Sequence, residues 1–394
     1  MYTQHVSATE HEQTSAPQRA IWVLDLNSAR SWLIPDTQSA RYPQWLGHCD
    51  QVTWLEACTN GHTRFVVADR RLRSDRYVAG SVAGPVWDLR TTGVVNMADP
   101  GDDTDHDLGF VVVGQVDEGG RLFNPFQDQS PGVILFTARD PELDEATHIA
   151  GSCYICPMLD WNGLIIPDDY YKAFRHRGLG GACSSPAVSR GGSVAFLAQK
   201  HDGYAADKNR VLIVTDKQKG TYKEIFASAD GKGQWDMSPF GVSFVVDGTL
   251  LLYVEEQGQR VLFQLSQAVE ATPADLKRIE PVHTRAKSVL DATPLGMEPS
   301  KVLLTCESFV HGQQFILHDL VSGSIRDFPL DNHRFGLTDT QIDEVWFPSA
   351  NGRRIHAWII RPSFFNPDHK YPLAYFIHDD QHGSWSSGWN ITAA

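Results

Sequence analysis

Short apolar runs, each long enough for one β-strand, recur along the whole chain. The clearest lie at 21–26, 52–55, 65–68, 110–113, 133–136, 194–198, 211–215, 250–254, 302–305 and 315–318. Turn-forming pairs such as Asn60-Gly61, Asp202-Gly203 and Asp247-Gly248 separate them. Strand-length runs divided by such pairs are typical of antiparallel hairpins and meanders. The pattern therefore predicts a mainly β protein.

Helical periodicity is scarce, and it predicts only short helices, at 268–279 and 168–175. A loose internal theme also recurs, in which a Pro-led stretch, a turn containing Gly and an apolar strand follow one another. Its copies lie at 42–55, 185–197 and 238–253. A strand–turn–strand unit repeated along a long chain favours a β-propeller over a sandwich or a barrel.

The pattern changes near residue 340. The segment 354–361 reads as one long strand after the turn pair Asn351-Gly352, and 362–370 is a polar loop that contains Pro. The run Pro372–His378 is continuously apolar, which suits a central strand buried on both faces. An α/β domain is therefore expected to begin in this part of the chain.

Composition and charge narrow the class of function. The 394 residues are 42% hydrophobic and 21% charged, as in ordinary globular proteins. Lys and Arg number 34 and Asp and Glu 48, which gives a net charge of −14. Phosphate backbones and anionic membranes are bound through basic faces, so neither nucleic acid nor a membrane surface is an expected partner. Six Cys do not indicate a disulfide framework in a chain of this length.

The N-terminal segment 1–18 is polar and is expected to form a disordered tail. It lacks a basic stretch followed by an apolar one, so no secretory signal is expected. The longest apolar runs fall far short of the ~20 residues that span a bilayer. These features predict a cytoplasmic location.

Several motifs occur in an ordered series along the chain. Residues 351–362 read Asn-Gly-Arg-Arg-Ile-His-Ala-Trp-Ile-Ile-Arg-Pro, and 371–378 read Tyr-Pro-Leu-Ala-Tyr-Phe-Ile-His. Further motifs lie at 21–26, 119–125, 195–197, 202–210 and 235–239. Together they resemble the prolyl oligopeptidase family of serine peptidases, and within it the branch of fungal dipeptidyl-peptidase V and the acylaminoacyl peptidases. The likeness covers most of residues 20–390.

This resemblance implies a fold and a function. It implies a β-propeller of about seven blades over 19–334, without the family's strands ahead of residue 21, and the first strands of an incomplete α/β-hydrolase domain over 335–394. It also implies hydrolysis of peptides from their N-terminus, by acyl transfer to serine and without a cofactor or metal. In this family the propeller filters the peptides that reach a Ser-Asp-His triad.

The sequence departs from the family where the family usually reads His-Gly-Gly-Pro. The resemblance makes His378, Asp379, Asp380 and Gly383 the remnant of that oxyanion loop. Glycines permit a tight loop whose N–H groups help form an oxyanion hole, and two carboxylates there would repel a developing oxyanion. No Gly-x-Ser-x-Gly occurs in the sequence, so no catalytic residue is predicted and the chain is expected to be inactive alone. The alternative is a catalytically dead propeller that binds peptides or a partner protein.

Two Cys and His patterns could hold a metal, but each has a plainer interpretation. Cys153 and Cys156 lack a second Cys or His pair and are expected to lie in a strand. His378 and His382 follow an apolar run and are expected in the oxyanion loop rather than on a helix. The aspartates at 102, 103, 105 and 107 lack the Gly and Glu of a calcium loop, and a flexible acidic loop is expected.

Two further patterns resemble parts of a peptidase site. The pair Glu255-Glu256 could hold a free amine through charge-assisted hydrogen bonds. However, Gln257-Gly258 follows directly, and this predicts an ordinary exposed hairpin turn. Ser193 follows two glycines as a nucleophile can, but a strand comes after it, so a hairpin turn is expected there too.

Overall fold

The structure is a computed structural model. It describes residues 2–6, 18–24, 31–34, 40–46, 51–57, 63–70, 77–79, 87–88, 110–113, 115–116, 122–123, 132–139, 143, 147–158, 172–174, 178–189, 193–203, 207–216, 221–246, 249–268, 271–279, 288–295, 300–328, 337–377 and 385–389. The chain divides into two compact units, Met1–Asp207 with Leu212–Lys223, and Lys208–Val211 with Glu224–Ala394.

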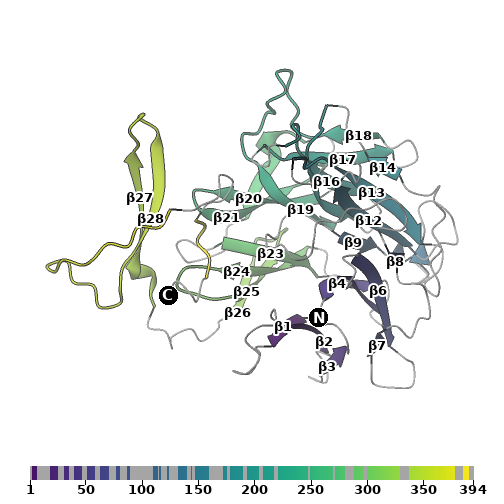
Figure 1. The fold of residues 1–394 in the computed structure, drawn as a ribbon, viewed down its shortest axis with the longest axis horizontal. Helices are drawn as coiled ribbons and strands as arrows, with labels where there is room; N and C mark the ends of the chain where they lie inside the picture. Colours follow the sequence, from purple (N-terminus) through teal and green to yellow (C-terminus); the bar gives the residue numbers. More distant parts are fainter. Residues whose placement is uncertain are drawn as a thin grey trace. The chain divides into compact units, whose positions relative to one another are not determined.

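Antiparallel sheets make up the first unit (Figure 1). Two of them are β1-β2-β3 (Tyr2–Val6, Gln18–Leu24, Ser31–Ile34) and β4-β5-β6-β7 (Ala40–Leu46, Gln51–Ala57, Thr63–Arg70, Tyr77–Ala79), in which β8 (Trp87–Asp88) also pairs with β6. The others are β10-β11 (Gln115–Val116, Leu122–Phe123) and β14-β13-β12-β9 (Lys172–Phe174, Gly151–Met158, Gly132–Arg139, Phe110–Val113). Most of the sheet β15-β16-β17-β18 (Cys183–Val188, Val194–Ala198, Arg210–Asp216, Thr221–Glu224) also belongs to this unit.

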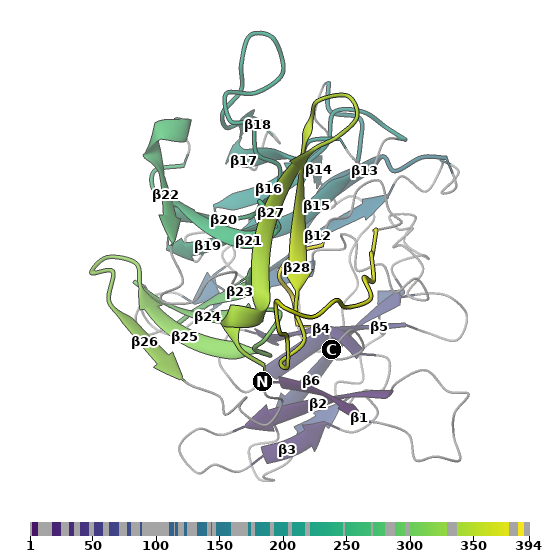
Figure 2. The ribbon, with the colours of Figure 1, turned by 90° about the vertical axis from the view of Figure 1, so that its left-hand side faces the viewer.

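The second unit holds two four-stranded meanders and a hairpin (Figure 2). The meanders are β19-β20-β21-β22 (Pro239–Val246, Thr249–Glu256, Gln259–Leu265, Leu276–Ile279) and β23-β24-β25-β26 (Ser288–Pro294, Lys301–Glu307, Gln314–Asp319, Ile325–Phe328). The hairpin pairs β27 (Ile342–Pro348) with β28 (Arg354–Ile360), and 3-10 turns lie at Pro273–Asp275 and Asp339–Gln341. The described residues contain no α-helix.

The burial pattern of single strands explains why these sheets stack. Leu250 to Val254 on β20 are all buried, and so is every residue of β16. Successive side chains of a strand point to opposite faces, so both faces of these sheets are covered. By contrast, β26, the last strand of the meander β23-β24-β25-β26, is mostly exposed. Inner strands covered on both sides and an exposed outer strand are typical of propeller blades, and the predicted mainly β fold is confirmed.

The core of the second unit lies between its two meanders. Residues of β20 and β21 such as Leu251 and Leu262 pack with Val302, Leu304 and Ile316 of β24 and β25. Each of these side chains is at most 1% exposed. Burial of one such side chain stabilises a fold by about 1.5–3 kcal/mol relative to exposure, so this interface holds the two sheets together.

The structure differs from several sequence predictions. Tyr2–Val6, expected in the disordered tail, form β1, because they pair with Gln18–Leu24 and satisfy their backbone groups there. The predicted helix at 268–279 is a single 3-10 turn followed by the strand Leu276–Ile279, and within 168–175 the structure places the strand Lys172–Phe174. These segments have a sheet edge to pair with, and pairing outweighs a weak local preference.

The run Pro372–His378 was predicted to be a buried central strand, and this prediction is wrong for the part that is described. Residues 371–377 have no regular secondary structure. Leu373 is 87% exposed and Phe376 is 74% exposed. A central strand needs neighbours on both edges, and no described strand pairs with this run.

Two further points concern the organisation of the chain. The predicted domain boundary between residues 334 and 335 lies outside the described residues and stays a prediction. Among the segments that the structure describes, none forms a helix of the length and apolarity needed to cross a membrane.

Candidate functional site

The residues predicted to remain from an oxyanion loop, His378, Asp379, Asp380 and Gly383, lie outside the described residues. The same holds for His382 and for the aspartates at 102–107. Their predicted roles therefore stay predictions. In the described part of the chain, no group of three or more His, Cys, Asp or Glu side chains could hold a metal ion.

Cys153 and Cys156 both fall within β13, as predicted. The Cys153 side chain is fully buried in an apolar cluster with Leu135, Phe196 and Leu212. Burial raises the pKa of the Cys153 thiol well above its usual value. A thiol held neutral among apolar side chains is a poor nucleophile and a poor metal ligand, so the structural interpretation holds for Cys153.

Ser193 lies in the hairpin between β15 and β16, as predicted. The backbone N–H of Ser189 donates to the Ser193 carbonyl at 2.8 Å, and the Ser193 N–H donates to Ser189 Oγ at 2.9 Å. These bonds close the turn, and the fully buried strand β16 follows it directly. Ser193 is therefore a turn residue.

The pair Glu255-Glu256 ends β20 at a tight turn, as predicted. Gln257 and Gly258 have φ angles of 52° and 69°, which is the backbone of a type I′ hairpin turn. Glu256 forms an ion pair with Arg278, so it is not free to bind an amine. The expectation of an ordinary exposed turn is corrected at Gly258. A Cβ there would lie 2.7 Å from Nε1 of Trp358 and 2.8 Å from Cε1 of His356, so the turn packs against β28.

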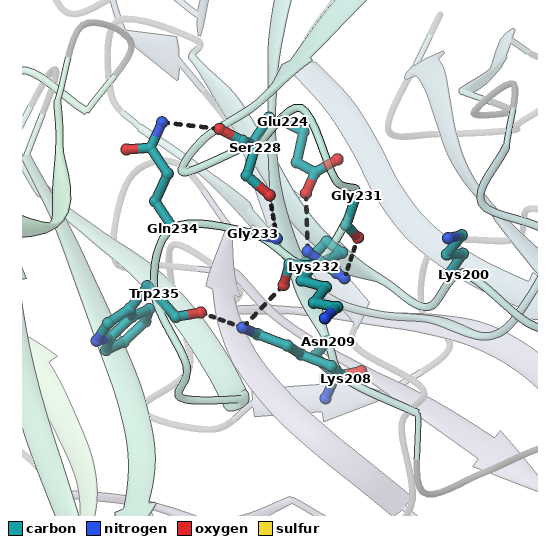
Figure 3. A network of polar contacts seen from close by, with 12 residues as sticks. Lys200, Lys208, Asn209, Glu224, Ser228, Gly231, Lys232, Gly233, Gln234 and Trp235 are labelled. Atoms are coloured by element: carbon teal, nitrogen blue, oxygen red, sulfur yellow. Dashed lines mark hydrogen bonds and ion pairs between the residues drawn. The ribbon is translucent and has the colours of Figure 1, made fainter.

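Two of the motifs that carried the resemblance meet in the second unit, where the end of the motif 202–210, residues 208–210, contacts the motif 235–239 (Figure 3). Lys208 Nζ donates to the Trp235 carbonyl. The Asn209 N–H donates to Ser238 Oγ at 3.0 Å, and Asn209 Nδ2 donates to the Pro239 carbonyl at 2.9 Å. Residues about thirty positions apart are thus joined through backbone groups. Such contacts place β19 beside the start of β17.

Arg210 supports the loop between the end of β18 and Trp235. Its side chain is 9% exposed, contacts Glu224 Oε1 at 3.3 Å and donates to the Gly231 carbonyl at 2.9 Å. Gly233 has a φ of +84°, which side chains rarely adopt, and a Cβ there would lie 2.6 Å from this guanidinium. Burial lowers the pKa of the nearby Lys208, and the Arg210 charge acts in the same direction.

The loop ends at Trp235, whose indole ring lies between two aromatic rings. It meets Phe226 and Phe263 edge-on, each with a centroid distance of 5.6 Å. Such contacts stabilise by about 0.5–1.5 kcal/mol each beyond burial. The cations of this network, Lys208 and Arg210, contact backbone carbonyls and one carboxylate. We therefore interpret the network as a structural brace, and the two motifs as determinants of the fold and not of catalysis.

The first unit has a comparable brace in the same motif. The Asp207 carboxylate accepts the N–H groups of Lys200 and His201 at 2.9 and 2.8 Å. Asp202 accepts the N–H groups of Ile149 and Ala150 at 2.8 and 2.9 Å. Burial alone would raise the pKa of Asp202, but His148 and these N–H groups outweigh it and lower the pKa. Both aspartates are therefore occupied in holding loops.

An aromatic cluster surrounds the β27–β28 hairpin, and sequence analysis did not identify it. His356 lies 5.0 Å from the Trp358 ring and 4.9 Å from the Trp346 ring, and Phe309 lies 5.4 Å from Trp358. Glu344 contacts His356 Nε2 at 3.2 Å and accepts a hydrogen bond from Trp346 Nε1 at 3.0 Å. The sequence does show aromatic side chains at alternate positions 356 and 358, and another at 346. Only the pairing of β27 with β28 shows that these side chains meet.

Comparison with known proteins gives dipeptidyl-peptidase 5 proteins among the sequence relatives. No family model matches the sequence. The chain is 26% identical over 268 residues to dipeptidyl-peptidase 5 of Schizosaccharomyces pombe, a match that covers 67% of this chain and 35% of the relative. It is 29% identical over 273 residues to dipeptidyl-peptidase 5 of Aspergillus fumigatus, with 65% and 34% covered. The chain therefore spans about a third of the length of these relatives.

Solved structures of similar fold include an acylaminoacyl peptidase and a puromycin hydrolase. Acylaminoacyl peptidase of Pyrococcus horikoshii matches with a TM-score of 0.56 at 11% identity, over 95% of this chain and 51% of its own. Puromycin hydrolase matches with a TM-score of 0.50 at 14% identity, over 91% and 48%. The predicted resemblance to the prolyl oligopeptidase family and its propeller-like fold are confirmed, while the number of blades stays a prediction.

Proposed function

We propose that this chain is the β-propeller part of a serine peptidase of the dipeptidyl-peptidase 5 kind and that it selects the peptides admitted to catalysis. The observation that carries the proposal is the match of about two thirds of the chain to dipeptidyl-peptidase 5 proteins, together with the acylaminoacyl peptidase-like fold. The braces at Lys208 and Asp207 support it, because they give the resembling motifs a role in propeller architecture.

We further propose that a polypeptide of these 394 residues does not cleave peptides by itself. The sequence contains no Gly-x-Ser-x-Gly, the turn that presents the nucleophile in serine hydrolases of this type. Acyl transfer without its nucleophile loses several orders of magnitude in rate. Such a polypeptide should bind peptides and release them unchanged.

Hydrolysis of a dipeptidyl p-nitroanilide tests the second proposal. The purified 394-residue polypeptide is assayed beside full-length dipeptidyl-peptidase 5 of Schizosaccharomyces pombe, and mass spectrometry confirms the length of each. We expect turnover by the yeast enzyme and none above background by the polypeptide. Turnover by the polypeptide at a rate within tenfold of the yeast enzyme would refute the second proposal.

The second candidate function is a binding module for peptides or a partner protein that acts without catalysis. The replacement of His-Gly-Gly-Pro by His378-Asp379-Asp380-Gln381 favours it, because carboxylates oppose an oxyanion. Sequencing of the transcript past codon 394 distinguishes the two functions. A downstream Gly-x-Ser-x-Gly followed by Asp and His supports the peptidase, and a stop codon supports the binding module.

A further inference from the structure

The segment 385–389, which we call the strap, is held by its backbone against the second unit. It reads Trp-Ser-Ser-Gly-Trp. The Trp358 Nε1–H donates to the Trp385 carbonyl at 3.2 Å. The Ser387 N–H donates to the Gly258 carbonyl at 2.8 Å. Contacts at alternate residues are typical of a peptide that lies along a binding groove.

The far end of the strap is held in the same way. The Gly388 N–H donates to the Ser386 carbonyl at 2.8 Å, which bends the chain after Ser387. The Trp389 N–H then donates to the carboxylate of Glu307, at the end of β24. The indole of Trp389 lies over Gly312, 3.8 Å from the position of a Cβ there. Three strap residues, Trp385, Ser387 and Trp389, thus contribute backbone groups to its seating.

One strap side chain enters a closed polar pocket. Ser387 is fully buried, and its Oγ lies 2.9 Å from Oγ of Ser288, which is also fully buried. The Arg260 N–H donates to the same Ser288 hydroxyl at 3.1 Å. A small hydroxyl fits this pocket, and a long or charged side chain would be buried without room or a partner.

The next strap position lies close to the end of the Glu307 side chain. A Cβ at Gly388 would lie 2.8 Å from Oε1 of Glu307. Burial raises the pKa of Glu307, although the Trp389 N–H and the Arg260 charge act against this. The residues that hold the strap come from the β20–β21 turn, β23, β24 and β28. We call Gly258, Ser288, Glu307 and Trp358 the strap site.

We propose that the strap site is a peptide-binding site of the second unit and that the strap occupies it in place of an external peptide. The ligand class is an extended peptide with a small hydroxyl residue between aromatic residues. This inference rests on the proposed peptide-handling function and names where the peptide lies. Backbone bonds give affinity without regard to sequence, and the Ser387 pocket supplies selectivity.

The covalent link between strap and site sets how strongly an external peptide must bind. A tethered segment acts at an effective concentration of the order of millimolar. A peptide with the same contacts but no tether therefore competes poorly with the seated strap. Removal of the strap from its site should expose the site to peptides in solution.

Fluorescence anisotropy tests this exchange on the full 394-residue chain. The probe is acetyl-Trp-Ser-Ser-Gly-Trp-amide carrying a fluorophore on a flexible linker. Ser387→Lys places a charged side chain in the closed pocket and should expel the strap, whereas Ser322→Lys makes the same change on an exposed turn. We expect the probe to bind Ser387→Lys at least tenfold more tightly than the wild type or Ser322→Lys. A probe with Lys at its third position should not bind.

Equal binding to all three proteins, or no binding to any at millimolar probe, would overturn the proposal. Hydrogen exchange of the wild type provides a second measurement should Ser387→Lys fail to fold. We expect the Ser387 amide to exchange at least tenfold more slowly than an unstructured amide and to lose this protection in Ser288→Ala. Exchange of the wild-type amide at the unstructured rate would also overturn the proposal. Neither measurement depends on hydrolysis, so the p-nitroanilide assay can fail or succeed separately.

Discussion

Replacement of Arg210 by Met tests whether the brace between the two motifs stabilises the fold. Methionine keeps much of the apolar stem and removes the guanidinium. The variant loses the contact with Glu224 at 3.3 Å and the hydrogen bond to the Gly231 carbonyl at 2.9 Å. The pair is largely buried, with 9% of the Arg210 side chain and 20% of the Glu224 side chain exposed.

The expected loss follows from these two contacts. Hydrogen bonds to charged groups contribute about 1.5–3 kcal/mol each. Removal of the guanidinium leaves the largely buried Glu224 carboxylate without its opposite charge. The Nε–H of Arg210 is buried without a hydrogen-bond partner among the described residues. Removal of this group therefore offsets the loss in the free energy of unfolding by about 1 kcal/mol. Glu224 can also regain some hydration. We therefore expect Arg210→Met to lower the free energy of unfolding by about 2–4 kcal/mol.

Urea unfolding, followed by circular dichroism, measures this loss through the midpoint concentration. Arg278→Met is the matched control, because Arg278 pairs with Glu256 at a site where the two side chains are 38% and 24% exposed. Exposed pairs contribute about 0.2–1 kcal/mol, so the control should change stability by no more than that. Equal midpoints for the two variants would show that the brace contributes no more than a surface ion pair and would refute the reasoning.

Three further predictions rest on single contacts. Gly258→Ala should lower the melting temperature more than Gly352→Ala does. Both glycines have a positive φ, but only at Gly258 would a Cβ lie 2.7 Å from the Trp358 ring. Equal shifts of the melting temperature would count against the packing of this turn. Cys153, which is fully buried and whose pKa burial raises well above its usual value, should react with maleimide at pH 8 only after unfolding, as peptide mapping would show; rapid labelling of the native protein would contradict its burial. Asp202→Asn should destabilise the protein at pH 7 and have no effect at low pH. The pKa of Asp202 is lowered in the folded protein, so its carboxylate contributes stability above about pH 4, and this stability is lost as the pH falls through the folded-state pKa. Acid unfolding of both proteins measures the difference in stability, and an equal effect of the substitution at both pH values would exclude this linkage.

Local sequence patterns were sufficient wherever a strand or turn depends on its own residues. The apolar run at Leu250–Val254 predicted a strand covered on both faces, and the pair Gln257-Gly258 predicted its turn. Backbone conformation at such positions is set by side-chain branching and by the freedom of glycine, which are properties of single residues. The ordered series of motifs likewise predicted the relatives that comparison then found.

Positions that depend on a partner distant in sequence could not be predicted in this way. Tyr2–Val6 are polar, and they form a strand only because Gln18–Leu24 offer an edge. Pro372–Ile377 are apolar, but no described strand pairs with them. A strand is stable when its backbone groups are paired, and pairing is a property of the neighbour as much as of the segment.

The sequence by itself determined the class of fold, the positions of the most apolar strands and of several turns, and the resemblance to dipeptidyl-peptidase 5 proteins. Only the tertiary structure showed that Lys208 and Trp235 meet, that Gly258 packs under Trp358, and that a buried serine at 387 seats the strap. Apolar periodicity and turn residues act over a few positions along the chain. Hydrogen bonds between residues 27 or 99 positions apart arise only when the sheets bring them together.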